Sequence, residues 1–144
     1  MFGVTLAPAS RADLPFAAGV LARGMRDNPG HVALFGPDPI RRVRALTTMF
    51  GALLPTMSPL PSCAWRAGWI VAVLGMLPPD QSHFFTVSRA LHIGPALFAR
   101  APGAAVRGFV WMRAWERQHI PEPHWHVGPL AVEAALQGSA SAVS

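Results

Sequence analysis

The sequence contains no lysine, no tyrosine and a single cysteine, Cys63. One cysteine excludes an internal disulfide and offers no Cys-x-x-Cys metal pair, so a reducing cytoplasm is the expected compartment. Charged residues are scarce at 13%, whereas hydrophobic residues make up 51%, a balance too apolar for general disorder. The 144 residues are therefore expected to form one domain with a buried core.

Long apolar runs and clustered charge are also missing. The longest apolar run, from Gly68 to Pro79, is well short of the roughly 20 residues that a bilayer-spanning helix needs, and no secretory signal precedes it. All twelve basic residues are arginines, spread from Arg11 to Arg117, whereas a nucleic-acid-binding protein concentrates its charge. We therefore expect neither a membrane nor a nucleic acid as partner, and codon bias is the simpler explanation of the missing lysine.

The first predicted helix has recognisable start and stop signals. Ser10 and Asp13 have the spacing of a capping box. Apolar residues then recur at helical intervals from Leu14 to Met25, until Asn28-Pro29 ends the pattern. A helix is expected over 14–25.

A second helix is predicted after residue 38. Asp38 is placed to cap it, and Pro39 occupies its first turn, where the missing N–H costs nothing. Its apolar stripe leaves Arg41, Arg42 and Arg44 largely on the other side. This arginine cluster is interpreted as a solvated helix face.

The remaining elements alternate between strands and helices. A continuously apolar run that includes β-branched residues predicts a strand buried on both faces over Trp69–Leu77. Further elements are a short strand at Phe2–Leu6, helical segments at 82–100 (interrupted by Gly94-Pro95) and Ala104–Gln118, a strand at His124–Val132, and loops at 30–36 and 55–61. This order favours an α/β (α+β) domain with a mixed open sheet and flanking helices.

The terminal strand carries the strongest local pattern. Alternation places His124, His126, Leu130 and Val132 on one face. Pro129 cannot donate a ladder hydrogen bond, so the pairing should be bulged there. No carboxylate or thiolate completes a metal set with the two histidines, so no metal site is expected.

From about His119 to Gly138 the sequence resembles the GCN5-related N-acetyltransferase (GNAT) family. The acetyl-CoA segment of that family reads Leu-x-Val, four residues, then Gln or Arg, x, x, Gly, x, Gly or Ala, and Leu130, Val132 and Gln137 match this spacing. The resemblance implies an acyltransferase that uses acetyl-CoA as co-substrate. It would transfer the acetyl group to a primary amine of a small molecule or peptide.

The resemblance also implies a binding site. The pantetheine arm of acetyl-CoA would pair with the backbone of the terminal strand, and the pyrophosphate would lie on the loop that follows. The cofactor-binding residues implied are Leu130, Val132, Gln137, Gly138, Ser139, Ala140 and Ala142. His126 is the preferred proton acceptor, because it shares the predicted face of Leu130 and an imidazole pKa of about 6.5 suits deprotonation of an amine. Glu116, Glu122 and Glu133 are its rivals.

The sequence departs from the family where the family has Gly-x-Gly. Ala140-Ser141-Ala142 stands there instead, and deleting one G from GGC-ATC-GGC, which encodes Gly-Ile-Gly, gives Ala-Ser-Ala. We therefore expect 1–144 to be one incomplete, C-terminally truncated domain that lacks the last helices and strands of the family, with 139–144 a non-family tail. Two alternatives stay open: an inactive fragment of a frameshifted gene, and a non-catalytic interaction module that forms oligomers through an exposed sheet edge.

Overall fold

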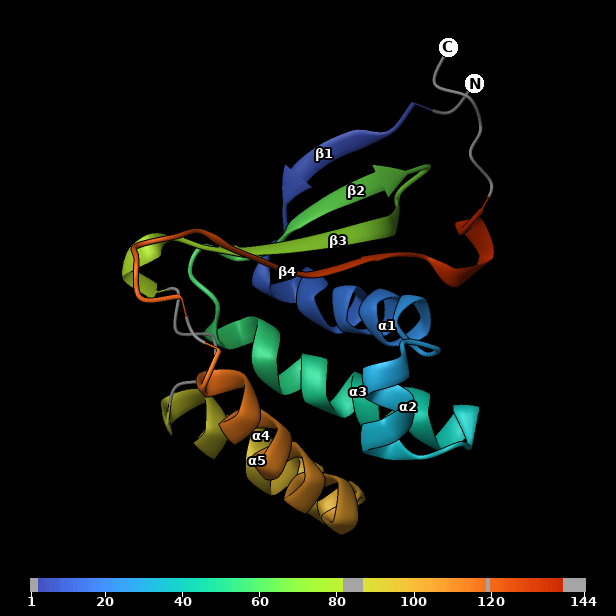
Figure 1. Ribbon diagram of the computed structural model, residues 1–144. Helices are drawn as coiled ribbons and strands as arrows, with labels where there is room; N and C mark the ends of the chain where they lie inside the picture. Colours follow the sequence, from blue (N-terminus) through green and yellow to red (C-terminus); the bar gives the residue numbers. More distant parts are fainter. Residues whose placement is uncertain (1–2, 82–86, 119, 139–144) are drawn as a thin grey trace.

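Four antiparallel strands form one open sheet, and the described helices lie on one side of it (Figure 1). The computed structural model describes residues 3–81, 87–118 and 120–138. The strands are β1 (Thr5–Pro8), β2 (Ser62–Arg66), β3 (Trp69–Leu77) and β4 (His126–Val132). They stand in the sheet in the order β1-β2-β3-β4. The predicted α+β class, with an open sheet and flanking helices, is confirmed, although the described strand pairs are all antiparallel rather than mixed.

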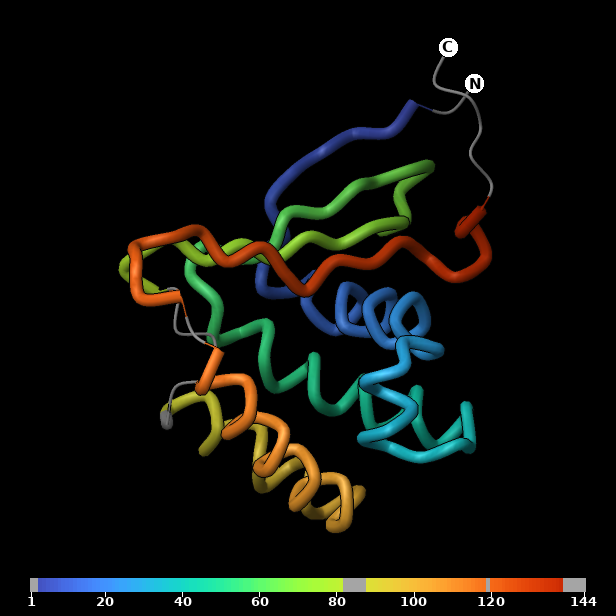
Figure 2. The backbone as a smooth tube through the Cα atoms, viewed as in Figure 1, coloured from blue at the N-terminus to red at the C-terminus, as the bar shows by residue number. Residues whose placement is uncertain are grey.

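The helices form two groups. They are α1 (Leu14–Gly24), α2 (Pro29–Phe35) and α3 (Pro39–Leu53) between β1 and β2, and α4 (Val87–Arg100) and α5 (Pro102–Glu116) between β3 and β4. Helix α1 packs on β3 and β4, α3 packs on α1, and the α4–α5 hairpin packs on α3, away from the sheet (Figure 2). In the described parts of the chain, no helix has the length and apolarity needed to cross a membrane.

The two predicted helix starts are confirmed. The Asp13 carboxylate accepts hydrogen bonds from the Ser10 N–H at 2.8 Å and the Ser10 hydroxyl at 2.6 Å, and these bonds lower the pKa of Asp13. Asp38 Oδ1 accepts from the N–H groups of Ile40 and Arg41 at 2.9 and 3.2 Å. Both carboxylates satisfy donors that have no partner inside their helices.

Two segments without a predicted helix or strand, 30–36 and 62–66, form regular structure instead. Helix α2 begins where the helical pattern stops, because Asn28 caps it by accepting from the Gly30 N–H at 2.9 Å and Pro29 fits its first turn. Strand β2 follows a proline-rich stretch and pairs with both β1 and β3. Helix α2 has 7 residues and strand β2 has 5, too few to show a periodic apolar pattern in the sequence.

Two further predictions were wrong in detail. Helix α4 runs through Pro95 without interruption, since packing of Ile93 and Leu97 toward the core outweighs one lost backbone hydrogen bond. Strand β3 is covered on one face only: Leu77 is fully buried, whereas Met76 is 37% exposed. The described helices cover one side of the sheet and leave the other uncovered.

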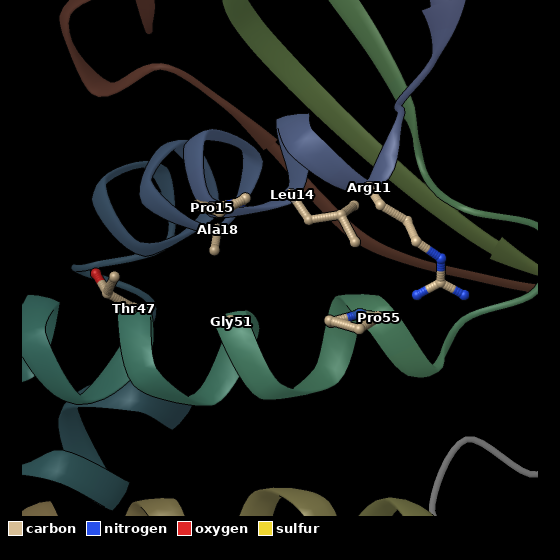
Figure 3. Close-up of a pocket in the computed structure, with 7 residues that line it drawn as sticks. All are labelled: Arg11, Leu14, Pro15, Ala18, Thr47, Gly51 and Pro55. Carbon is tan, nitrogen blue, oxygen red and sulfur yellow. The ribbon is translucent and has the colours of Figure 1, made fainter.

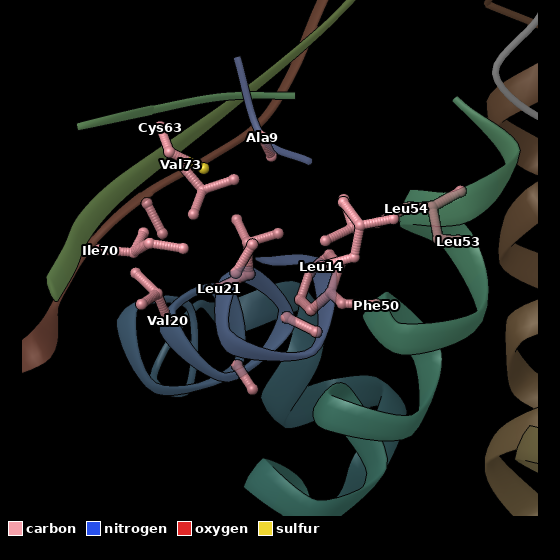
Figure 4. Packing of buried hydrophobic residues seen from close by; sticks show 14 of the residues in the cluster. Ala9, Leu14, Val20, Leu21, Phe50, Leu53, Leu54, Cys63, Ile70 and Val73 are labelled. Carbon is pink, nitrogen blue, oxygen red and sulfur yellow. The ribbon is translucent and has the colours of Figure 1, made fainter. Parts of the chain in front are cut away.

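The core lies between this covered face and helices α1 and α3 (Figure 4). Leu21, Leu46 and Leu54 are completely buried in it, and Val73 contributes from the sheet. A leucine buried in this way stabilises the fold by about 1.5–3 kcal/mol. Cys63 belongs to the same cluster, and burial raises its thiol pKa to about 11, with the Asp13 charge adding to the shift. The thiol is therefore protonated and structural.

The sequence predicts that all three clustered arginines are solvated, but one of them is buried. Arg41 and Arg44 are exposed, but Arg42 is only 4% exposed. Its guanidinium donates to the carbonyl of Arg26, to the Gly36 carbonyl at 2.7 Å and to Asp27 Oδ1 at 3.1 Å. Carbonyls near the C-terminal ends of α1 and α2 have no partner inside their helices. Arg42 is buried because its guanidinium supplies hydrogen-bond donors to them.

Candidate functional site

Strand β4 borders β3 on one side and stands at the edge of the four described strands. Val127 pairs with Met76 and Leu130 with Leu74, so β4 contains one residue more than β3 over this interval. The bulge predicted at Pro129 is thereby confirmed.

Two glycines make the bulge sterically feasible. Gly128 has φ of +151°, a conformation that residues with a side chain rarely adopt. At Gly75, opposite the bulge, an added Cβ would lie 2.6 Å from the Gly128 carbonyl oxygen. The backbones of β3 and β4 therefore approach each other more closely here than any side chain would allow.

Beyond the bulge, the ladder turns part of the β4 backbone outward. The Glu133 N–H donates to the Val71 carbonyl at 2.8 Å. In an antiparallel pair, hydrogen-bonded and non-hydrogen-bonded residues alternate, so Leu130 and Val132 direct their N–H and C=O groups away from β3. These are the two residues whose backbone the family resemblance assigns to the pantetheine arm.

His126 does not share the face of Leu130, contrary to the sequence-based expectation. It pairs with Leu77, which is fully buried on the helix side, whereas Leu130 pairs with Leu74 on the uncovered side. The extra residue of the bulge inverts the alternation between the two ends of β4. A Cβ added at Gly128 would lie 3.7 Å from His126 Nε2, so the ring borders the bulge.

The surroundings of His126 favour its neutral form. Its pKa lies below the ordinary 6.5, mainly because the ring is partly desolvated and further because of electrostatic interactions with His124 and Arg89. Arg89 on α4 is only 6% exposed and donates to Thr56 Oγ1 at 3.2 Å. No sequence pattern places this arginine near His126, because their proximity depends on how α4 folds back.

Glu133, one of the rival bases, is held in an ion pair. Arg23 donates to both of its carboxylate oxygens, with Nε 2.9 Å from Oε1 and Nη2 2.7 Å from Oε2. This pair lowers the pKa of Glu133 and makes the carboxylate a weaker base. Glu116 and Glu122 are exposed.

The segment after β4 is pinned to α1. Gln137 Nε2 donates to the carbonyls of Gly24 and Val132, both at 2.9 Å. Gly138, with φ of +76°, is the last residue described. Ser139, Ala140 and Ala142, together with the predicted non-family tail at 139–144, lie outside the described residues.

A groove of about 300 Å³ lies elsewhere, between α1 and α3 (Figure 3). It is lined by Arg11, Leu14, Pro15, Ala18, Thr47, Gly51 and Pro55. None of these residues belongs to β4, and the lining includes no imidazole, carboxylate or thiol that could transfer a proton or form an acyl intermediate. We therefore place the candidate site at the β4 edge. The described residues hold no cluster of three His, Cys, Asp or Glu side chains that could bind a metal.

An open sheet with an outward-turned, bulged edge strand and helices on one side is an acetyltransferase-like fold. A solved structure supports this class: histone acetyltransferase HPA2 and related acetyltransferase from Corynebacterium glutamicum matches with a TM-score of 0.60 and 20% sequence identity. The match covers 95% of this chain and 64% of that one, so this chain spans less than two thirds of the neighbour's length. No family model and no curated protein sequence matches the chain.

Proposed function

We propose that this protein is an N-acetyltransferase of the GNAT type, which transfers an acetyl group from acetyl-CoA to a primary amine of a small molecule or peptide. The observation that carries the proposal is the outward-turned backbone beside the bulge of β4: the N–H and C=O groups of Leu130 and the N–H of Val132. The Val132 carbonyl accepts from Gln137. An amide-rich pantetheine arm can pair with such an edge as an added strand does. The acetyltransferase-like fold supports the same assignment.

The chemistry needs little from the protein beyond positioning and one proton acceptor. The amine nitrogen attacks the thioester carbonyl, the new C–N bond forms, and the C–S bond breaks to release the CoA thiolate. The ammonium proton passes to His126 Nε2, which is neutral because its pKa is depressed, and from there reaches the thiolate. Arg89, near His126, favours transfer of the proton onward by disfavouring the imidazolium.

Acetyl-CoA should raise the thermal midpoint of the protein. A ligand at about 100 times its dissociation constant adds about 2.7 kcal/mol to stability, or roughly 8 °C for a chain of this size. The variant Val132→Pro removes an outward N–H, which an edge strand tolerates, and should lose this shift. Differential scanning fluorimetry with about 1 mM acetyl-CoA measures it.

The matched control is Val132→Thr, which keeps the N–H and the shape of the side chain. It should retain the shift, and circular dichroism should show both variants folded without ligand. A wild-type protein whose midpoint does not move with acetyl-CoA would contradict the proposal. So would a proline variant that responds as the wild type does.

The role of His126 is tested by the pH dependence of turnover. A base must be unprotonated, so kcat should fall as the pH drops through the depressed pKa of His126, with a midpoint below 6.5. His126→Gln should abolish this acid limb and lower kcat by about 10²-fold or more. Thiol release from acetyl-CoA, measured with spermidine, free lysine and an amino-terminal peptide as acceptors, provides the assay. An unchanged acid limb in the variant would assign the base to another group.

A further inference from the structure

The groove between α1 and α3 has free space at its middle. Thr47, Gly51 and Pro55 stand four residues apart, so they share one face of α3 and of the turn after it. Leu14 and Ala18 of α1 lie opposite (Figure 3). A Cβ added at Gly51 would meet no atom within 4 Å. The groove is therefore open at this point, because the residue on its α3 side has no side chain.

The walls of the groove are aliphatic. Leu14 and Ala18 are buried and form its floor, and the two prolines of the lining are exposed at its rims. The Thr47 hydroxyl donates to the Val43 carbonyl at 2.8 Å, so its proton is used within α3. Such a lining suits a hydrocarbon chain, which needs no hydrogen-bond partner of its own.

Arg11, in the turn before α1, brings a positive charge to the groove. Of the seven described residues that line it, Arg11 alone is charged. Its side chain is directed toward the gap between the two helices (Figure 3). The arginines in ion pairs among the described residues are those at positions 23, 26, 41 and 42. The Arg11 guanidinium therefore has no carboxylate partner in the described chain, and its planar fork matches the two oxygens of a carboxylate.

The size and shape of the groove limit what it can bind. Its volume of about 300 Å³ is at the lower end of the range for small-molecule pockets. At about 30 Å³ for each atom the size of a water molecule, it holds roughly ten non-hydrogen atoms. Eight residues of helix from Thr47 to Pro55 rise by about 12 Å, so the space is long rather than round. A carboxylate on an extended chain of about eight carbons has that number of atoms and fits that length.

We propose that this groove binds a medium-chain alkyl carboxylate. The hydrocarbon chain lies against Leu14 and Ala18, and the carboxylate accepts hydrogen bonds from Arg11 at one end. The net charge of +5 favours an anion over a neutral ligand of the same shape. Binding in an open groove of this size is weak, with a dissociation constant of about 1 mM. No lining residue belongs to β4, so this binding is independent of the proposed acetyl transfer.

Sodium octanoate is the probe for this site. Added to about 10 mM, it should shift the backbone amide signals of Ala18, Thr47 and Gly51 in proton–nitrogen NMR spectra along a saturating curve. Octan-1-ol has the same chain without the charge and should bind about fivefold more weakly, since an exposed ion pair contributes only modestly. Arg11→Gln should weaken octanoate binding by the same factor and leave octan-1-ol binding unchanged. Gly51→Leu fills the groove, which has room for the new side chain, and should abolish the shifts of Ala18 and Thr47.

The matched control is Arg113→Gln, because Arg113 is exposed on α5 and does not line the groove. It should bind octanoate as the wild type does. A wild type without saturable shifts at about 10 mM octanoate overturns the proposal, as does one that binds octan-1-ol equally tightly. Undiminished octanoate binding by Gly51→Leu, with circular dichroism showing a folded variant, overturns it as well. Equal weakening in Arg11→Gln and Arg113→Gln would assign the effect to net charge and not to this groove.

Discussion

Arg42→Ala should lower the free energy of unfolding by about 3 kcal/mol. The variant leaves the carbonyls of Arg26 and Gly36 without their donor, and it also removes a buried aliphatic stem. A hydrogen bond from a charged donor contributes about 1.5–3 kcal/mol, and these two are partly buried. Equilibrium unfolding in urea measures the difference.

Arg41→Ala is the matched control for this prediction. The Arg41 side chain is 85% exposed and lies 3.6 Å from Asp38 in a surface ion pair, an interaction with a contribution below about 1 kcal/mol. Its substitution should change stability little. Equal losses at positions 41 and 42 would mean that the Arg42 hydrogen bonds do not stabilise the fold.

Gly24→Ala should destabilise the contact between α1 and β4 by about 2–3 kcal/mol. A Cβ at this position would lie 2.5 Å from the Val132 carbonyl oxygen and 2.8 Å from the Ala131 Cβ. Neither atom is the end of a flexible side chain, so helix and strand must move apart, and the hydrogen bond from Gln137 to the Gly24 carbonyl is strained as they do. A lower midpoint in urea would show the loss.

Gly51→Ala provides the control in a helix of similar length. Nothing lies within 4 Å of the Cβ that this variant adds to α3, and alanine favours a helix over glycine by about 0.5–1 kcal/mol. Stability should therefore rise at position 51 while it falls at position 24. If Gly24→Ala were also stabilising, α1 would not pack on β4 as closely as described.

The features that could be predicted from sequence are those encoded within a few neighbouring residues. The capping box at Ser10 and the cap at Asp38 each depend on a short spacing, and Pro129 marks the bulge through the chemistry of one residue. These local signals set the starts of α1 and α3 and the irregularity of β4.

The features that could not be predicted depend on contacts between distant segments. Strand β2 becomes a strand because β1 and β3 flank it. Arg42 is buried because the chain around α2 surrounds it, and α4 brings Arg89 toward His126. Sequence alternation places His126 on the wrong face of the sheet, because the extra residue of the bulge shifts the alternation along β4. Pro129 predicts that a bulge is present, but it does not show to which face the side chains before the bulge are turned.

The order of the strands has a consequence for how the protein folds. Neighbouring strands in the sheet are consecutive along the chain, yet two of the three pairings join distant residues. Pro8 pairs with Ser62 and Leu77 with His126. Closing these loops of about 50 residues costs entropy and slows folding. Among the described strands, only the β2–β3 hairpin is local. We expect this hairpin to nucleate the sheet, with the two edge strands adding late, so the strand proposed to bind acetyl-CoA would be among the last elements to form and the first to open.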